Sequence, residues 1–311
     1  MKLLFTHGTK IKEDSNGMYY TGGSYSQSIW NRYLSIANEL NVIARTDSII
    51  YDPEYARRNF NYFNKEKICL IRVPDLASSL KEFFNLQRRK KKNKIIEHAV
   101  LNNDCVIARL PSSNGNIAIS IARKYNKPYL IELVGCPWDA YWNHSWKGKL
   151  IAPFMRYATK KAVKNAPYVV YVTNEFLQHR YPTTGRTIGC SNVALPTLDE
   201  SVLDARLHKI EQITKYKPIV LGTTAAVDVR YKGQEYVIQA IAELNKQGYN
   251  FVYRLVGGGD KARLQSIAEK YRVADKVIFE GSIPHERVFD YLDDIDIYVQ
   301  PSKTEGLPRA L

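Results

Sequence analysis

The amino-acid sequence predicts an α/β protein built from two tandem Rossmann-like domains, the second of them incomplete. Two observations predict this class. Short apolar segments alternate with longer amphipathic segments along most of the chain, which is typical of βαβ units and a parallel sheet. The 311 residues, 45% of them apolar and 24% charged, suit two domains that each have a core of their own. We place the domains at residues 1–196 and 217–311, joined by a polar connection at 197–216.

The first domain is predicted from apolar runs of strand length and from apolar residues spaced three or four apart. Strands are expected at 3–6, 68–73, 106–110, 129–134, 168–173 and 186–194. Helices are expected at about 26–40, 79–101, 117–125, 150–164 and 174–180. A polar loop containing Gly17, Gly22 and Gly23 is expected to lead into the first helix.

The second domain shows the same alternation after the polar connection. Strands are expected at 219–223, 251–256, 277–280 and 295–300, and helices at 234–247, 260–271 and 284–292. Each strand is followed by a loop rich in glycine or polar residues. Ligands of parallel α/β sheets bind at this carboxyl end of the strands, so these loops are the first place to look for a site.

Composition excludes several protein classes. The four cysteines, Cys69, Cys105, Cys136 and Cys190, lack the paired spacing of a zinc site or a disulfide framework. No run of about 18 uncharged apolar residues predicts a membrane span. The first residues turn polar too quickly for a signal peptide. We therefore expect a cytoplasmic protein.

Charge is distributed unevenly along the chain. Residues 1–200 hold 29 Lys and Arg against 16 Asp and Glu, a net charge of +13, whereas residues 201–311 hold 16 against 15, a net charge of +1. The densest basic run is 88–94. Such asymmetry points to an anionic partner of the first domain, for example a membrane surface. A solvated helix face explains the run equally well, and the absence of interleaved aromatic residues argues against nucleic acid.

The last stretch of the chain combines a strand, a turn and a new helix start. The apolar strand stops at Pro301, a polar loop with Glu305 and Gly306 follows, and Pro308 stands where a first helical turn would begin. Free backbone N–H groups and the positive end of a helix dipole make such a turn an anion site. The chain ends within this element, so we expect it to be a fragment of a longer protein.

Two further groups of residues could bind phosphate. Arg230 and Lys232 precede a predicted helix start and could hold a diphosphate, although a pair of surface cations is the plainer interpretation. Backbone at Gly22 and Gly23 could approach a phosphate, but a double glycine alone more often marks an ordinary loop. The glycine run from Gly257 lacks the Gly-x-Gly-x-x-Gly spacing of a dinucleotide fingerprint.

An aromatic segment follows the strand predicted at 129–134. Its three tryptophans, together with Asp139 and His144, could form a platform for a sugar or lipid-linked acceptor. Trp138, Asp139 and His144 are the candidates we single out. A buried aromatic cluster that anchors a long loop is an equally good interpretation.

Taken together, the second-domain motifs resemble glycosyltransferase family 4, the retaining sugar transferases of GT-B architecture. The resemblance rests on residues 222–233, 256–260, 279–281, 294–296 and 301–310. It is specific over 217–311 and looser over the first domain. It implies that the second domain binds a nucleotide-sugar and that the first domain binds the acceptor.

The resemblance also implies roles for single residues. Arg230 and Lys232 would contact the donor diphosphate as catalytic residues, and Glu305 would contact the transferred sugar or its neighbourhood. Donor-binding positions would be Gly22, Gly23, Gly257, Gly258, Ile283, Gly306 and Leu307. The chain departs from the family pattern in two places: Thr223 stands where an arginine is usual, and the second of two paired glutamates would fall beyond Leu311.

The reaction implied is transfer of a hexose with retention, in cell-surface polysaccharide synthesis. A nucleotide-sugar donor, a glycan or lipid-linked acceptor and an anionic membrane surface are the expected partners, with no nucleic acid, no metal and no cofactor. The protein is then expected at the inner membrane face. Two alternatives stay open: a nucleotide-sugar epimerase of similar build, and a non-enzymatic anion-binding module.

Overall fold

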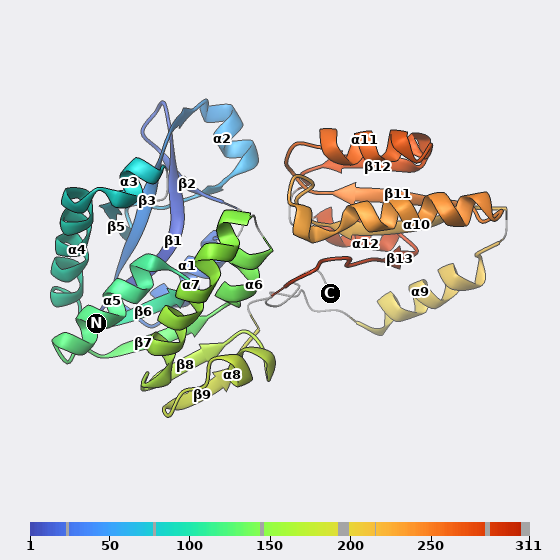
Figure 1. The fold of residues 1–311 in the computed structure, drawn as a ribbon. Coiled ribbons are helices and arrows are strands. Elements are labelled where there is room, and N and C mark those ends of the chain that lie inside the picture. Colours follow the sequence, from blue (N-terminus) through green and yellow to red (C-terminus); the bar gives the residue numbers. More distant parts are fainter. Residues whose placement is uncertain are drawn as a thin grey trace. The chain divides into compact units, whose positions relative to one another are not determined.

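The computed structural model describes residues 1–22, 25–76, 79–143, 146–191, 199–214, 216–283 and 287–305. The chain divides into two compact units, one formed by Met1–Trp138 and Ile151–Ser191 and the other by Asp139–Leu150 and Asn192–Leu311. Figure 1 shows their α/β architecture with parallel sheets, which confirms the predicted fold class. Among the described residues, no helix combines the length and the apolar character that a membrane crossing requires.

The first unit contains a nine-stranded sheet. Its strands are β1 (Lys2–Asp14), β2 (Tyr19–Thr21), β3 (Glu39–Tyr51), β4 (Asn61–Tyr62), β5 (Ile68–Val73), β6 (Cys105–Leu110), β7 (Tyr129–Leu133), β8 (Tyr168–Tyr171) and β9 (Arg186–Gly189). Its helices are α1 (Gln27–Leu34), α2 (Pro53–Asn59), α3 (Leu80–Phe84), α4 (Leu86–Leu101), α5 (Ser113–Lys124) and α8 (Phe176–Arg180). Helices α6 (Pro137–Trp142) and α7 (Trp146–Lys164) contain residues of both units.

Seven strands of this sheet are parallel, in the order β5-β3-β1-β6-β7-β8-β9. Strands β2 and β4 add an antiparallel extension beside the far end of β1. Because the strands are parallel and in register, Arg109 of β6 lies opposite Glu132 of β7 near their carboxyl ends. The sheet order therefore brings together polar residues that are distant in the sequence.

The core of the first unit explains why α1 is placed where it is. Trp30 and Tyr33 of α1 are buried against Phe5, whose ring meets the indole edge-on at a centroid distance of 5.6 Å. Burying such aromatic side chains contributes about 2–3 kcal/mol each. This packing fixes α1 on the sheet and holds the hydroxyl of Tyr33 close to the strand ends.

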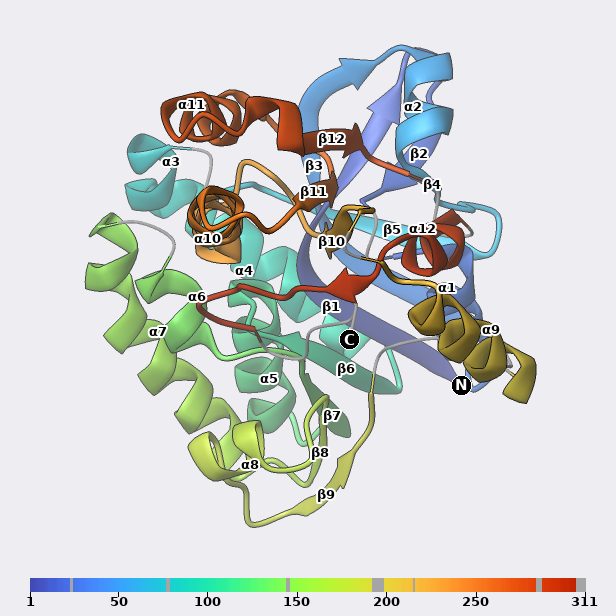
Figure 2. The ribbon, with the colours of Figure 1, turned by 90° about the vertical axis from the view of Figure 1, so that its right-hand side faces the viewer.

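The second unit is a four-stranded parallel sheet in the order β12-β11-β10-β13. Its elements are α9 (Glu200–Glu211), β10 (Ile219–Thr224), η1 (Arg230–Lys232), α10 (Gln234–Lys246), β11 (Phe251–Val256), α11 (Ala262–Lys270), η2 (Ala274–Lys276), β12 (Val277–Gly281), α12 (Val288–Asp294) and β13 (Ile297–Tyr298). One face of the sheet packs on α10 and α11, and the other packs on Tyr291 of α12. Figure 2 shows these helices on opposite sides of the strands.

Three strands of the first unit, β2, β3 and β4, were not predicted, and β3 is the longest of them. The spacing of Ile36, Ala37 and Leu40 extended the predicted first helix to residue 40, but α1 ends at Leu34 and β3 begins at Glu39. The backbone N–H of Ser35 closes the helix by bonding to carbonyls of its last turn. Leu40 and Ala37 are buried nonetheless, because a buried strand follows the helix directly. Apolar spacing alone does not separate these two cases.

Several predicted boundaries differ from the structure. The polar stretch read as a connection contains helix α9, which is capped by the Asp199 side chain and has no buried residue. The last strand spans only Ile297–Tyr298, and the strand expected at 186–194 ends at Gly189. The first strand is longer than expected, and the basic helix is broken at Asn85. Residues 192–198 and 284–286 lie outside the described residues.

Candidate nucleotide-sugar site

The loop after β10 lies directly against the loop after β13. Gly233, between η1 and α10, has a φ of +74°, and a Cβ built there would lie 2.1 Å from the carbonyl oxygen of Pro301. The backbone N–H of Lys303 donates to the carbonyl of Tyr231 over 2.8 Å. Because only glycine fits both the backbone conformation and the close approach, this residue joins the two loops at the carboxyl edge of the sheet.

Two of the three predicted catalytic residues meet at this edge. Lys232 Nζ lies 2.6 Å from Glu305 Oε1, and both side chains are about one-fifth exposed. The Gln300 amide also donates to Glu305 Oε1 over 3.0 Å. The structure therefore fixes the carboxylate between a cation and an amide. The sequence analysis did not single out Gln300, although it ends the predicted strand just before Pro301.

Arg230 begins the same 3₁₀ turn as Lys232, and its side chain is exposed. The turn precedes α10, a helix of 13 residues whose free N–H groups and dipole attract negative charge. The turn thus places two cations beside the positive end of a helix. This arrangement can stabilise a diphosphate, and Glu305 offsets part of the positive charge when no anion is bound.

Thr223, at the position where the resemblance expects an arginine, is fully buried. Its hydroxyl donates to the Val299 carbonyl over 2.6 Å and lies 2.7 Å from the hydroxyl of Tyr253. The side chain is therefore part of the interior of the sheet. Cations for an anionic ligand must come from elsewhere in these loops, and Arg230 and Lys232 are the cations the turn supplies.

The loop after β11 is held equally closely. A Cβ on Gly257 would lie 1.9 Å from the Ala225 carbonyl oxygen, and the Val227 N–H donates to the Gly258 carbonyl over 3.0 Å. Both predicted glycines thus border the loop that leads to Arg230 and Lys232. Ile283 follows β12, and its side chain packs against Val256, Tyr291 and Ile295.

A second polar cluster, which the sequence analysis missed, lies at the strand ends of the first unit. The Tyr33 hydroxyl donates to Glu132, with 3.0 and 2.9 Å to its two carboxylate oxygens, and Arg109 lies 3.4 Å from the same carboxylate. Burial raises the pKa of Glu132, which the neighbouring Arg109 and Tyr33 partly offset. The one signal in the sequence is a charged residue inside each of two apolar strands.

His7 follows the buried residues 3–6 of β1 in the same region. Burial, with the nearby charges of Arg109 and Arg45 acting in the same direction, lowers the pKa of His7 to about 3. The imidazole is therefore neutral over the physiological range. Its backbone carbonyl accepts a bond from Asn114, which ties β1 to the start of α5.

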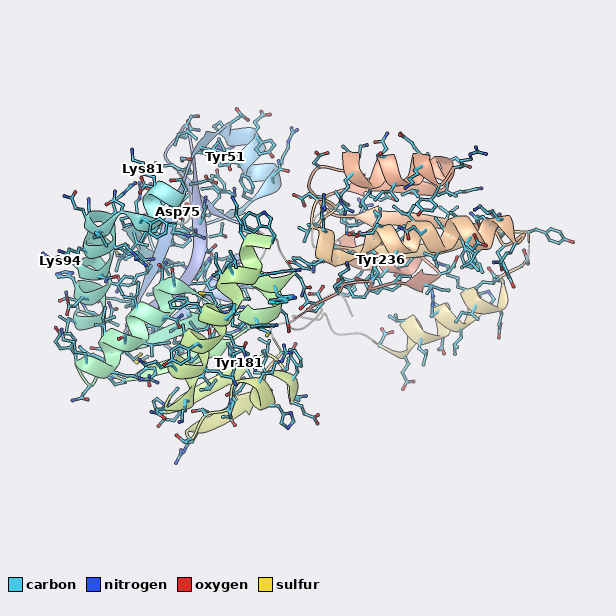
Figure 3. The ribbon with its side chains drawn as sticks, viewed as in Figure 1. Tyr51, Asp75, Lys81, Lys94, Tyr181 and Tyr236 are labelled. Atoms are coloured by element: carbon cyan, nitrogen blue, oxygen red, sulfur yellow. The ribbon has the colours of Figure 1, made fainter. Side chains whose placement is uncertain are left out.

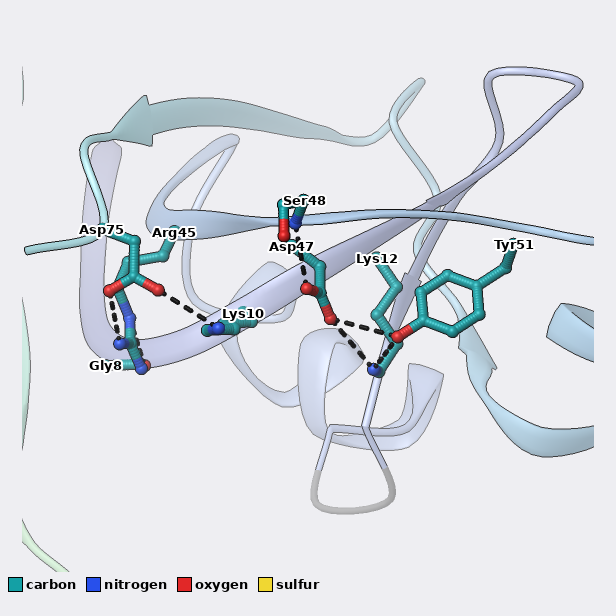
Figure 4. A network of polar contacts seen from close by, with 8 residues as sticks. All are labelled: Gly8, Lys10, Lys12, Arg45, Asp47, Ser48, Tyr51 and Asp75. Atoms are coloured by element: carbon teal, nitrogen blue, oxygen red, sulfur yellow. Dashed lines mark hydrogen bonds and ion pairs between the residues drawn. The ribbon is translucent and has the colours of Figure 1, made fainter. Parts of the chain in front are cut away.

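Further along β1, ion pairs connect β1, β3 and the loop after β5 (Figure 4). Asp75 accepts from Arg45 over 2.9 Å and pairs with Lys10 over 3.1 Å. Lys12 pairs with Asp47 over 3.3 Å and donates to the Tyr51 hydroxyl over 2.9 Å. Lys10, Lys12 and Arg45 are thus paired with carboxylates of the same unit, and we interpret these contacts as a structural network.

Residues 206–311 match the family model "Glycosyl transferases group 1". Protein CapJ of Staphylococcus aureus is 33% identical over 318 residues, an alignment that covers 100% of this chain and 75% of CapJ. The chain belongs to the group 1 glycosyl transferases. It is a glycosyltransferase, which confirms that part of the prediction.

Other relatives of this glycosyl transferase agree with its fold and family. Escherichia coli K12 WcaL, described as a putative colanic acid biosynthesis glycosyltransferase, is 38% identical over 87 residues, 26% of this chain and 21% of WcaL. Sucrose-phosphate synthase from Thermosynechococcus elongatus has a TM-score of 0.60 at 19% identity, covering 99% of this chain and 77% of the synthase. Anabaena HepE, in complex with UDP and glucose, has a TM-score of 0.55 at 14% identity, covering 98% and 75%. The structures support the GT-B fold.

Four predicted site residues lie outside the described residues: Gly23, His144, Gly306 and Leu307. Gly22 is described, in the first unit. Its carbonyl accepts from the Tyr25 N–H and the Asn61 side chain, and a Cβ there would meet no atom within 4 Å. Gly22 belongs to the first unit, whereas Lys232 and Glu305 belong to the second.

The predicted acceptor residues Trp138 and Asp139 lie on α6. The guanidinium of Arg156 lies 5.4 Å from the centre of the Trp138 ring, and the Asp139 carbonyl accepts from Asn143. Trp138 is half-buried, whereas Trp142 and Trp146 are 40% and 69% exposed. The aromatic segment of the glycosyl transferase is therefore only partly buried.

The described residues of the first unit also form depressions in the surface. One of about 920 Å³ is lined by residues such as Asn31, Asn38 and Lys67, around the starts of β3 and β5. That is the amino edge of the first sheet. We place the candidate site at the strand-end loops instead, because parallel α/β sheets bind ligands at their carboxyl edge.

Proposed function

We propose that this glycosyl transferase moves a sugar from a nucleotide-sugar donor to a glycan or lipid-linked acceptor in cell-surface polysaccharide synthesis. The role in polysaccharide synthesis is supported by the relationship to CapJ and by the colanic acid function given for WcaL. A nucleotide-sugar donor is supported by HepE, a protein of the same fold that was crystallised with UDP and glucose.

The observation on which the proposal rests is the contact between Lys232 and Glu305 at the carboxyl edge of the second sheet. Lys232 has three N–H donors, one of which reaches Glu305. The other two are available for the oxygens of a diphosphate, beside the first turn of α10. A charge-assisted hydrogen bond of this kind contributes about 1.5–3 kcal/mol.

In the proposed reaction the bond between the anomeric carbon and the diphosphate oxygen breaks, and the nucleoside diphosphate leaves with the bonding electrons. The acceptor hydroxyl oxygen bonds to the anomeric carbon on the same face, and its proton passes to a donor phosphate oxygen. Arg230, Lys232 and the start of α10 stabilise the charge that grows on the diphosphate. Glu305 would orient the sugar. This route retains the anomeric configuration and uses no enzyme nucleophile and no metal.

We assign the acceptor to the first unit, where Trp138 lies on α6 and Glu132 and Tyr33 lie at the strand ends; Asp139, the next residue of α6, is the first residue of the second unit. Aromatic side chains with polar tips suit sugar rings. A lipid-linked acceptor would bring the protein to the cytoplasmic face of a membrane, in agreement with the net charge of +13 of residues 1–200. Lys81 and Lys94, on α3 and α4, point outward from this unit (Figure 3).

A thermal-shift panel of nucleoside diphosphates and their sugars tests the proposal. A ligand present at 100 times its Kd stabilises the fold by about 2.7 kcal/mol. We expect one nucleotide to raise the Tm and its sugar conjugate to raise it at least as much. No shift with any nucleotide would contradict donor binding. Conversion of the donor sugar without any acceptor would favour the epimerase alternative.

A further inference from the structure

Helix α7 has two faces of opposite kind. Over its 19 residues, Trp146–Lys164, the sequence contains no acidic residue and six cations. Ala152, Met155, Thr159, Ala162 and Val163 are buried. These positions recur at three- and four-residue spacing, so they form the side of the helix that packs onto the protein. The opposite side carries large apolar residues where a surface helix normally carries polar ones.

The outward face of α7 is apolar and aromatic. Trp146, Leu150, Phe154 and Tyr157 follow each other at intervals of four, four and three residues, which places them on one stripe. Their exposed fractions are 69%, 74%, 69% and 66%. A single exposed aromatic residue is ordinary, but a row of four large ones is a contiguous patch of the kind that marks an interaction surface.

Cations border this stripe. At 100° per residue, Lys149, Arg156 and Lys160 lie along one flank and Lys147 lies on the other. Lys161 and Lys164 continue the stripe toward the end of the helix. The ammonium of Lys147 lies 5.7 Å from the ring centre of Trp146, and that of Lys149 lies 5.5 Å from the ring centre of Trp142. The charged ends are thus positioned beside the rings.

We propose that α7 lies flat on an anionic phospholipid surface, with its aromatic stripe inserted among the headgroups. Tryptophan, leucine, phenylalanine and tyrosine bordered by lysine and arginine are typical of helices that bind in the plane of a membrane interface. Each cation near an anionic leaflet contributes about 1 kcal/mol. A second copy of this chain suits the face poorly, because six cations would meet six cations.

The basic run 88–94 in α4 differs from this surface. In this run Lys90 and Lys91 are exposed, whereas Lys92 is buried. The exposed apolar residue of α4 that lies nearest to the run is Leu86, at the start of the helix. It supplies charge without a stripe of apolar residues. We therefore assign membrane insertion to α7 and a purely electrostatic contribution to α4.

This inference deepens the proposed function and rests on it, because the proposed lipid-linked acceptor is what would require the protein to bind a membrane. Its test does not use donor or acceptor. Co-sedimentation with vesicles of phosphatidylcholine containing phosphatidylglycerol reads binding alone. Failure of nucleotide binding would therefore leave this result standing, and failure of vesicle binding would leave transfer to a soluble acceptor untouched.

The 311-residue chain is expected to bind the phosphatidylglycerol vesicles and to bind pure phosphatidylcholine vesicles far less. The double variant Leu150→Ser/Phe154→Ser should lower the partition coefficient about tenfold or more. Lys149→Gln/Arg156→Gln/Lys160→Gln should lower it and flatten its dependence on salt. The matched control is Leu203→Ser/Leu207→Ser on α9, whose side chains are 60% and 51% exposed at the same helical spacing. It should bind like the unaltered chain.

A second measurement locates the stripe. Brominated phosphatidylglycerol should quench the tryptophan emission of the unaltered chain and quench that of Trp146→Phe much less. Equal binding by Leu150→Ser/Phe154→Ser and the unaltered chain would overturn the proposal. So would binding that does not require anionic lipid. Self-association that the same double substitution abolishes would assign the face to a second copy and overturn the proposal as well.

Discussion

At the scale of single residues, polar groups in the interior of the first unit are paired across the sheet. Tyr33, from α1, donates to Glu132 of β7, and Arg109 of β6 pairs with the same carboxylate. A buried carboxylate is stable only when its oxygens find such partners. Sequence analysis could not find this cluster, because Tyr33 and Glu132 are 99 positions apart and meet only through the strand order.

Tyr33→Phe should lower the free energy of unfolding by about 1.5–3 kcal/mol, because it removes a hydrogen bond to a buried charge. Urea denaturation measures this change. Tyr249→Phe, at a tyrosine that is 58% exposed, is the control and should change stability by less than about 0.5 kcal/mol. Similar values for the two variants would show that the Glu132 cluster contributes little.

His7 makes stability depend on pH. The folded state keeps the imidazole neutral down to a pKa of about 3, whereas an unfolded histidine binds a proton below about pH 6.5. The unfolded state therefore binds more protons between these values, and stability falls as the pH falls through this window. Between pH 6 and 5, the free energy of unfolding of His7→Asn should fall less steeply than that of the unaltered protein, by up to about 1.4 kcal/mol per pH unit. Parallel pH profiles of the two proteins would contradict the burial of a neutral His7.

At the scale of elements, the strand-end loops of the second unit are shaped by glycines against backbone. Gly233 approaches Pro301 and Gly257 approaches Ala225. Sequence analysis predicted these loops from Gly and Pro positions, and strand 251–256 matches β11. It missed α9 because the surrounding stretch is largely polar; Leu203, Leu207 and Ile210 recur at helical spacing, but the helix buries no side chain. It missed β3 because its apolar start continued the spacing of α1.

Substituting adjacent glycines tests the loop after β11. Gly257→Ala should lower the free energy of unfolding by more than about 2 kcal/mol, because the added Cβ would lie 1.9 Å from the Ala225 backbone oxygen. Gly258→Ala is the matched control. Its Cβ meets only the Ser282 hydroxyl, which can rotate away, so we expect less than about 1 kcal/mol. Differential scanning calorimetry compares the two. Equal effects would mean that the backbone contact is not what fixes the loop.

At the scale of the whole molecule, the sequence predicted two tandem parallel α/β domains, because strand and helix patterns alternate twice around a polar stretch. The motifs of the second domain then indicated the family. Charge asymmetry pointed to an anionic partner but not to its binding surface, because α7 is distinguished by the exposure of its aromatic residues. The exposure of these aromatic residues is known only from the structure, which shows that the opposite side of α7 packs on the protein.

The central claim is that Lys232, held by Glu305, binds the donor diphosphate. Isothermal titration with the nucleoside diphosphate found by the thermal-shift panel tests it most directly. Lys232→Gln should weaken binding about tenfold or more, since it removes a charge-assisted hydrogen bond. Lys246→Gln, at an exposed lysine in the last turn of α10, should leave the Kd unchanged. Equal affinity of Lys232→Gln and the unaltered chain would contradict the claim.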